Sequence, residues 1–381
     1  MQERAAAPPD LVFQFLSTME FIMNGSTLRA FFVTATLSTA LGWHVGASAQ
    51  WFPYQAEATE PAFAADGKKT PLAYSPLPKA AKKWDICVSF PHMKDAYWLG
   101  VDYGVVEESR RLGVKMQVLD AGGYTNLGKQ ISQIEDCVAR GAQAVVIGAI
   151  SADGLNQVLK TVAAKKVPVI DLVNGINSPD VSAKSLVSFY TMGHSTGEYL
   201  ASKHPAGSPA VKVGWFPGPA GAGWVEAAHK GFMDAVKGSA VNVLEPKYGD
   251  TGKEAQSKLI EDVLQGQPDL AYVAGTAVTA EAATSILRAR GLDKKVQVLS
   301  FYMTPGVYDG IQKGRIVAAP ADSMVIQGRI AIDQAVRLLE GKEVHRHVGP
   351  KIFVVDSGNL KSIRMEDILP PNGFKPAFEV K

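Results

Sequence analysis

The residues best suited to chemistry in this chain are Asp95, Tyr97 and Trp98, which follow an apolar segment, 85–90, and open an amphipathic one, 96–112. The two large aromatic side chains offer flat π faces, and the carboxylate beside them offers a hydrogen-bonding anchor. This combination is typical of a binding site for a small molecule. Asp95 is also a favoured N-cap for a helix that begins at the next residue, and capping is compatible with ligand binding.

Tyr97 and Trp98 have an alternative interpretation as core residues of the first helical turn. Adjacent residues of a helix do not face the same side, so at least one of the two is expected to face a ligand. Tyr124 follows a Gly-Gly turn and Tyr302 follows a predicted strand, which makes both further candidates at loop ends. Tyr124 could instead fill its own loop, and Tyr302 could pack between domains.

Motifs for catalysis or metal binding are missing from the sequence. The pattern Gly-x-Ser-x-Gly at 193–197 falls inside a predicted helix, 193–203, rather than at the strand-to-helix turn of a catalytic elbow. No Walker loop or paired-histidine metal motif occurs, and the glycine-rich stretch 218–223 lacks the order GxGxxG. His345 and His347 have no cysteine or carboxylate at ligand spacing. We interpret three polar residues near predicted loop ends as caps and loop residues: Asp153, Asp171 and His194. We therefore expect no enzymatic activity, no cofactor and no metal.

The length and composition indicate two domains. A chain of 381 residues with 46% hydrophobic and 20% charged residues can bury a large core, and chains beyond about 250 to 300 residues usually divide into domains. The formal net charge is +2, and the basic residues are scattered rather than gathered in a stripe. Neither nucleic acid nor a membrane surface is therefore expected as a partner.

Residues 1–49 are predicted to be a signal region. A basic residue precedes an apolar run, 30–43, which has about the length of a secretory signal core and is too short to span a bilayer. Ala47-Ser48-Ala49 matches the small-x-small cleavage pattern, so the mature chain is expected to begin at Gln50 in the periplasm. Met23 would make a more ordinary start than the first methionine.

Two cysteines occur, Cys87 in the first predicted strand and Cys137 near the end of the second predicted helix. In an oxidising compartment they could form a disulfide. The alternative is that both are small buried apolar side chains. The sequence leaves these two possibilities open.

From Trp84 the chain alternates apolar strands with amphipathic helices. In the first series the predicted strands are 85–90, 114–119, 144–148 and 167–173, and the predicted helices are 96–112, 125–140 and 152–165. In the second series the strands are 211–216, 241–246, 270–274, 296–300 and 316–319, and the helices are 193–203, 223–237, 253–265 and 279–290. This alternation predicts parallel sheets covered on both faces, with ligands at the carboxyl ends of the strands.

We therefore predict an α/β fold of two Rossmann-like lobes joined by a hinge with three crossings. Lobe one is expected to comprise residues 84–188 together with 320–356, because a long predicted helix, 325–341, returns to it. Lobe two is expected to comprise residues 189–319. The segment 50–83, rich in Pro, Ala and Lys, is predicted to be an extended arm, and 357–381 an irregular tail.

From Ile86 to Val355 the order of predicted elements resembles that of type I periplasmic solute-binding proteins. Three patterns are similar to those of ribose-type binders: Leu119-Asp120-Ala121-Gly122, Val167-Pro168-Val169-Ile170 and Gly231-Phe232. Within this fold, four segments resemble the receptors that sense trimethylamine N-oxide for a membrane sensor histidine kinase: 90–98, 121–124, 300–302 and 306–308.

The resemblance implies a pocket between the lobes for trimethylamine N-oxide, and a partner in the periplasmic domain of a sensor histidine kinase. Because this ligand has a positive nitrogen under three methyl groups and an oxygen that accepts hydrogen bonds, an aromatic cage with donors would suit it. The ribose-type pattern also implies a polar hinge contact at Asp322, although Asp322 could equally cap the last long helix. The alternative function is the binding component of an ABC importer for a small amine or sugar.

Two positions depart from the receptor pattern. The receptors carry a tryptophan before a Met-Gly pair, whereas this chain has Phe189 in the corresponding stretch, 188–193. Trp224 stands where a small residue is expected, and it could replace the missing ring or lie at the surface. Both residues are therefore site candidates, and a related N-oxide or a quaternary amine such as a betaine is an alternative ligand.

Overall fold

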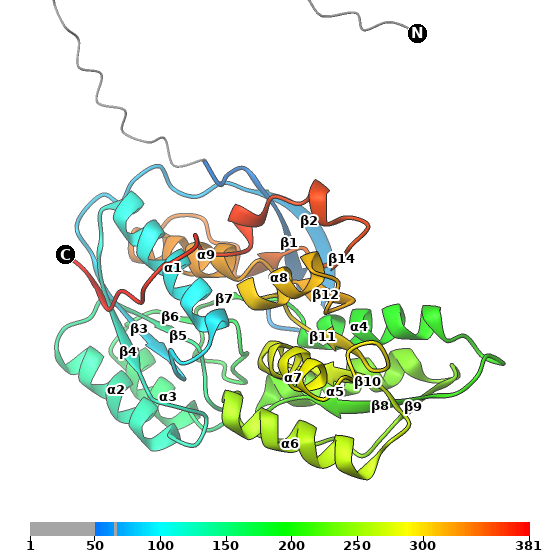
Figure 1. Cartoon of the computed structure of the whole chain (residues 1–381). Helices are drawn as coiled ribbons and strands as arrows, with labels where there is room; N and C mark the ends of the chain where they lie inside the picture. Colours follow the sequence, from blue (N-terminus) through cyan, green and yellow to red (C-terminus); the bar gives the residue numbers. More distant parts are fainter. Residues whose placement is uncertain (1–49, 65–66) are drawn as a thin grey trace, which may run out of the picture. The chain divides into compact units, whose positions relative to one another are not determined.

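Strands and covering helices alternate through most of the chain in the computed structural model, which describes residues 50–64 and 67–381. The expected signal region, 1–49, lies outside the described residues. The strands form a nine-stranded and a six-stranded sheet, each with helices on both faces (Figure 1). The predicted fold of two α/β lobes with mostly parallel sheets is confirmed.

The sheet of lobe one has the strand order β15-β4-β3-β5-β6-β7-β13-β1-β2. Its parallel strands are β4 (Lys115–Asp120), β3 (Asp85–Phe90), β5 (Ala144–Ile147), β6 (Val169–Leu172), β7 (Ala183–Ser185) and β13 (His347–Pro350). One face carries α1 (Ala96–Leu112) and α9 (Met324–Leu339), and the other carries α2 (Leu127–Ala139) and α3 (Asn156–Ala164). Because both faces are covered, the central strands are almost continuously apolar.

The sheet of lobe two has the strand order β14-β12-β11-β10-β8-β9. Its strands are β14 (Phe353–Asp356), β12 (Ala318–Ala321), β11 (Gln297–Ser300), β10 (Leu270–Gly275), β8 (Val211–Phe216) and β9 (Val241–Val243). Helices α4 (Phe189–Lys203) and α5 (Gly223–Val236) pack against each other, as do α6 (Lys253–Gly266) and α7 (Ala277–Ala289). The short helix α8 (Pro305–Gln312) packs against α7.

Helix α8 was not predicted, although the sequence carries a start signal for it. Thr304 caps the helix by accepting a hydrogen bond from the backbone N–H of Val307, and Pro305 occupies the first helical turn. Threonine before proline is a frequent beginning of a helix.

Three segments cross between the lobes: 186–188, 322–323 and 351–352. The expected assignment of 320–356 to lobe one is wrong at its end, because β14 pairs antiparallel with β12 in the second sheet. Strand β12 itself, 318–321, also belongs to that sheet. The apolar residues of β14 cover what would otherwise be an open edge of β12.

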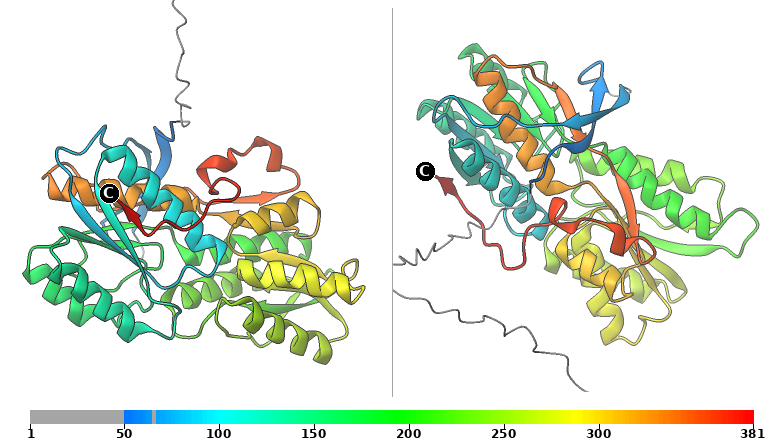
Figure 2. Two further views of the ribbon diagram at one scale, coloured as in Figure 1. Left: turned by 60° about the vertical axis from the view of Figure 1, so that its left-hand side comes forward. Right: turned by 90° about the horizontal axis from the view of Figure 1, so that it is seen from above.

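The segment 50–83 does not form a free arm. Its strands β1 (Tyr54–Glu60) and β2 (Lys68–Tyr74) form an antiparallel pair, and β1 adds to the first sheet beside β13. Figure 2 shows these strands at one edge of the molecule. The proline-rich composition predicted an extended arm, but Pro71 is accommodated within β2, because proline is tolerated on an edge strand and β2 is outermost.

The tail 357–381 also packs against lobe one, and it is not irregular throughout. Its last strand, β15 (Glu379–Val380), pairs antiparallel with β4. Along the way Phe374 packs edge-on against Tyr103 of α1, with ring centroids 5.1 Å apart. The backbone N–H of Ala377 donates a hydrogen bond of 2.9 Å to the carboxylate of Asp102. The tail therefore runs along α1 and covers its outer side (Figure 2).

Within the described ranges, no helix is long and apolar enough to cross a membrane. The same residues contain no group of three or more His, Cys, Asp or Glu side chains arranged to hold a metal ion.

Cys87 of β3 and Cys137 of α2 are joined by a disulfide, with their Cα atoms 6.0 Å apart. This Cα separation lies within the usual range for natural disulfides. We expect thiol labelling of the denatured, unreduced protein to find no free thiol, because both cysteines are consumed in the bond. The same sample should give two labelled thiols after reduction. Labelling without reduction would show that the two cysteines are independent buried side chains.

Candidate ligand-binding site between the lobes

A small cavity lies where the carboxyl ends of strands from both sheets approach each other. Its volume is about 20 Å³. It is lined by Asp95, Tyr97, Trp98, Tyr124, Asn174, Phe189, Trp224, Thr251 and Tyr302. The structure thus brings together seven of the eight residues that the sequence put forward, leaves Asp322 outside the lining, and adds Asn174 and Thr251.

Asp95 both caps α1 and faces the cavity. Its Oδ1 accepts a hydrogen bond of 3.1 Å from the backbone N–H of Trp98, which fixes the first turn of the helix. Its Oδ2 lies 3.8 Å from Nε2 of His92. Burial in the apolar cavity raises the pKa of Asp95 to about 7, against the weaker opposing effect of the backbone hydrogen bonds.

Tyr97 and Trp98 are both buried, and they point to different neighbours. The Tyr97 ring meets Tyr302 of lobe two edge-on, with centroids 5.2 Å apart. The Trp98 ring packs on Phe90 at 5.0 Å and lies over Gly148, where any Cβ atom would overlap the indole. Close approach of the indole therefore requires glycine at 148.

Asp322 supports Tyr97 from behind rather than lining the cavity. Its Oδ2 accepts hydrogen bonds from the Tyr97 hydroxyl at 2.6 Å and from Nε2 of Gln327 at 2.9 Å. The alternative role as a cap of α9 is wrong, since the cap residue is Ser323 and no side-chain hydrogen bond caps this helix. Burial raises the pKa of Asp322 to about 6. Asp322 thus positions an aromatic residue of the site at a hinge crossing.

Asn174 holds Tyr124 in place. Its Nδ2 donates hydrogen bonds to the Tyr124 hydroxyl at 3.0 Å and to the backbone carbonyl of Ala149 at 2.7 Å. Burial raises the pKa of Tyr124, so its hydroxyl keeps its proton. Asn174 was missed, although it follows strand β6 at the carboxyl edge of the sheet, where a search for polar residues would have found it.

Phe189 and Trp224 form the wall from lobe two. Trp224 is 5% exposed, so the alternative of a surface position is wrong. Its ring lies 5.6 Å from that of Phe189 and 5.9 Å from that of Tyr124. Gly218 makes room for it: this residue has φ of 122°, and a Cβ atom there would come within 2.7 Å of the indole.

Two polar contacts join the lobes beside the cavity, and neither was predicted. Nε2 of the buried His92 lies 3.1 Å from the Thr251 hydroxyl. Lys94 forms an ion pair with Asp250 at 2.5 Å. Burial and the nearby Lys94 lower the pKa of His92 to about 4, so its imidazole is neutral near pH 7.

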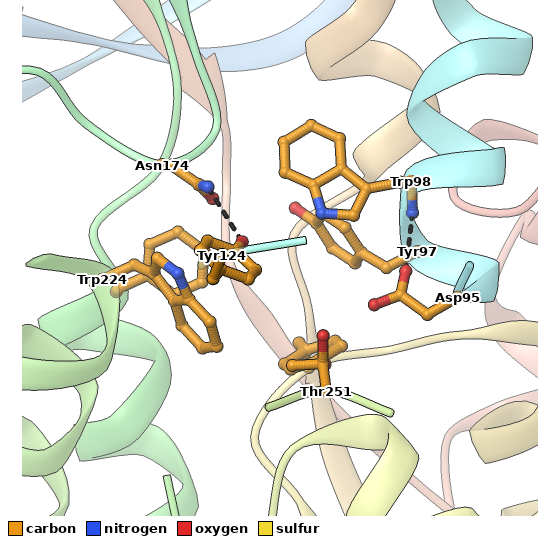
Figure 3. Close-up of a pocket in the computed structure, with 9 residues that line it drawn as sticks. Asp95, Tyr97, Trp98, Tyr124, Asn174, Trp224 and Thr251 are labelled. Carbon is orange, nitrogen blue, oxygen red and sulfur yellow. Dashed lines mark hydrogen bonds between the residues drawn. The ribbon is translucent and has the colours of Figure 1, made fainter. Parts of the chain in front are cut away.

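The cavity is polarised from one side to the other. Figure 3 shows Asp95 and Trp98 on one side, Trp224 and Asn174 on the opposite side, and Tyr124 between them. Nε1 of Trp224 is buried and has no hydrogen-bond partner among the described residues. An acidic group therefore faces a hydrogen-bond donor across a space walled by aromatic rings, an arrangement suited to a small polar molecule with separated charges.

Comparison with known proteins identifies the class. Residues 86–343 match the model of the periplasmic binding protein domain, and the chain belongs to this family. It is a periplasmic solute-binding protein, and the family consists of receptors and transport components. The chain is 38% identical to the periplasmic protein TorT of Escherichia coli (strain K12) over 326 residues, which cover 84% of this chain and 93% of TorT.

Two solved structures are close to this one. An ABC transporter solute-binding protein from Bradyrhizobium sp. BTAi1 with bound Bis-Tris is 72% identical, covers 87% of this chain and 99% of its own, and superposes with a TM-score of 0.76. TorT in its complex with the TorS sensor domain, in the presence of TMAO, is 32% identical, covers 78% of this chain and all of its own, and has a TM-score of 0.71.

The raised pKa of Asp95 predicts a pH-dependent effect of Asp95→Asn. The folded protein holds the proton up to about pH 7, whereas the unfolded chain releases it near the ordinary aspartate pKa of 3.8. Wild type should therefore lose stability relative to Asp95→Asn as the pH rises from about 4 to about 7. We expect the difference in unfolding free energy to change by on the order of 2 to 4 kcal/mol across this window.

Denaturant unfolding of both proteins at several pH values measures this difference. Asparagine is also a good N-cap, so the helix start is kept. The other groups near Asp95, namely His92, Lys94 and Glu281, are present in both proteins and largely cancel. A difference that does not vary with pH would mean that Asp95 is ionised in the folded protein throughout.

Proposed function

We propose that this protein binds trimethylamine N-oxide, or a closely related small methylated amine, in the cavity between its lobes, and reports it to the periplasmic domain of a membrane sensor histidine kinase. The observation that carries the proposal is the polarised aromatic cavity. Rings of Tyr97, Trp98, Tyr124 and Tyr302 surround it, with a carboxyl group on one side and an indole N–H on the other.

The chemistry of the ligand matches these groups. A methylated nitrogen carries positive charge but no N–H, so it is held by aromatic faces and by nearby negative charge rather than by hydrogen bonds. Each ring contributes about 0.5 to 2 kcal/mol, depending on desolvation. The N-oxide oxygen accepts hydrogen bonds, which the unpaired indole N–H of Trp224 and the hydroxyl of Tyr124 can donate.

The side chains that line the cavity bear on the class of ligand. A sugar would need several polar side chains for its hydroxyl groups, whereas most of the lining here is aromatic. A compact methylated amine therefore fits the lining better than a sugar.

The proposed partner follows from the likeness to TorT, which has been solved in complex with the TorS sensor domain. A ligand that touches both lobes favours the closed arrangement by its differential affinity, and a partner that contacts both lobes can read this closure. Tyr97 and Trp98 from lobe one and Tyr302 and Trp224 from lobe two provide such contacts.

A second candidate function is the binding component of an ABC importer. It is favoured by the 72% identical Bradyrhizobium protein, which is described as an ABC transporter solute-binding protein with bound Bis-Tris. Bis-Tris is itself a tertiary amine, so this likeness also supports an amine as the ligand. Receptor and importer use the same cavity and closure, and they differ in the partner.

Isothermal titration of the mature chain from Gln50 tests the ligand. We expect saturable binding of trimethylamine N-oxide, because its charge separation matches the cavity. Trimethylamine, which lacks the oxygen, should bind more weakly, and ribose should not bind. Glycine betaine tests the alternative amine. Binding of betaine alone would change the ligand but keep the amine class, and binding of ribose alone would contradict an amine ligand.

Deletion of the gene in the host bacterium distinguishes a sensor-kinase partner from an importer partner. For a receptor, we expect loss of the transcriptional response to trimethylamine N-oxide while uptake of the labelled compound continues, because a sensor kinase no longer receives its input. Complementation with wild type is the control. Loss of uptake with an intact response would instead support the importer.

A further inference from the structure

We propose that Trp224 determines the specificity of this site by donating its indole N–H to the oxygen of the ligand. The inference rests on the proposed function, since it concerns how an N-oxide or a similar oxyanion-bearing amine is distinguished from a simple methylated cation. Trp224 is one of the two positions at which the sequence departs from the receptors it resembles.

The tryptophans of the described chain differ in the pairing of their indole N–H. Three of them donate their indole N–H to a protein acceptor at 3.0 to 3.1 Å: Trp51 to Glu108, Trp84 to Glu340 and Trp215 to His229. Trp224, which lines the cavity, has a buried Nε1 with no acceptor among the described residues. The cavity therefore holds a buried indole N–H with which a ligand could pair.

The N–H of Trp224 has no access to bulk water, which makes a partner energetically valuable. Its Nε1 is buried without an acceptor, and a buried donor left unpaired costs free energy because it has lost its hydrogen bonds to water. An oxygen placed in the cavity would remove this cost. A ligand without an acceptor, however well it fits the aromatic rings, would leave the N–H unpaired.

Tyr124 supplies a second donor next to the first. Its hydroxyl oxygen accepts from Asn174, so its own proton is free to point into the cavity. Its ring lies 5.9 Å from that of Trp224, and Figure 3 shows the two side by side, opposite Asp95. Two donors on one side and a carboxyl group on the other fix the direction in which a dipolar amine binds.

The ring of Trp224 has a separate structural role, which decides how the N–H is tested. Asn174, Phe189 and Trp224 line the cavity on one side and a wider open groove of about 560 Å³ on the other. Trp224→Ala would join the two spaces and change several properties at once. Trp224→Phe keeps an aromatic wall and removes the N–H.

The experiment compares two ligands of the same shape. Trimethylamine N-oxide and tetramethylammonium both present three methyl groups on a positive nitrogen, and only the first has an oxygen that accepts a hydrogen bond. We expect Trp224→Phe to weaken binding of the N-oxide by roughly ten- to a hundredfold, as for loss of a hydrogen bond to a charged acceptor. Binding of tetramethylammonium should change by less than about threefold.

Trp215→Phe is the matched control, since Trp215 is buried in lobe two and its N–H is already paired with His229. It should leave both affinities unchanged. Equal losses for both ligands in Trp224→Phe would overturn the donor role and leave only a packing role. Unchanged N-oxide binding would also overturn the inference while leaving the proposed function intact. No binding of the N-oxide to wild type would overturn both.

A spectroscopic measurement covers the case in which Trp224→Phe does not fold. In ¹H–¹⁵N spectra of Trp98→Phe, the indole of the site that remains is that of Trp224. We expect trimethylamine N-oxide to shift this indole N–H signal and tetramethylammonium to leave it nearly unchanged. If the only indole signal that responds in wild type is the one missing from Trp98→Phe, the donor is Trp98 and the inference is wrong.

Discussion

The hydrogen bond from the Trp98 backbone to the Asp95 carboxylate is the contact on which the site depends, because it fixes the first turn of α1. Once that turn is set, Tyr97 is directed toward the hinge, where Asp322 holds its hydroxyl, and Trp98 is directed over the strand ends of lobe one. A single capping residue thus orients two rings of the cavity. It also contributes the carboxyl group that gives the cavity its polarity.

The low polarity of the surroundings explains why a few groups can define the site. Near the cavity Asp95 and Asp322 are buried and Glu281 is half-buried, and desolvation raises the pKa of each. Removal from water makes an unpaired carboxylate costly, and for the same reason it strengthens attraction between the rings and a cation. The apolar walls raise the pKa of these carboxyl groups in the free protein. The same walls would therefore favour the binding of a methylated cation.

Much of this arrangement could be predicted from the sequence, because the alternation of apolar strands with amphipathic helices places loop ends at one edge of each sheet. Seven of the lining residues were found in this way or through the family resemblance. Asn174 and Thr251 were not, since a polar residue in a loop has many possible roles and only the three-dimensional contacts select one. Strands β1 and β15 were missed because their partners β13 and β4 are distant in sequence, and β2 was missed because an edge strand carries a weak pattern of its own. Asp322 was placed correctly at the hinge, but its contact with Tyr97 depends on packing that no local pattern encodes.

The ion pair of Lys94 with Asp250 joins the lobes independently of what fills the cavity, and each side chain is more than a third exposed. Ion pairs between lobes shift the equilibrium between the open and closed forms of a ligand-free protein. The apparent affinity for the ligand rises with the fraction of molecules that are already in the binding-competent form. A stronger ion pair would raise the apparent affinity for the ligand. It would also reduce the difference in closure between the ligand-free and the ligand-bound protein. Because dissolved salt screens an exposed pair, the threshold at which such a protein responds is tied to the ionic strength of its compartment.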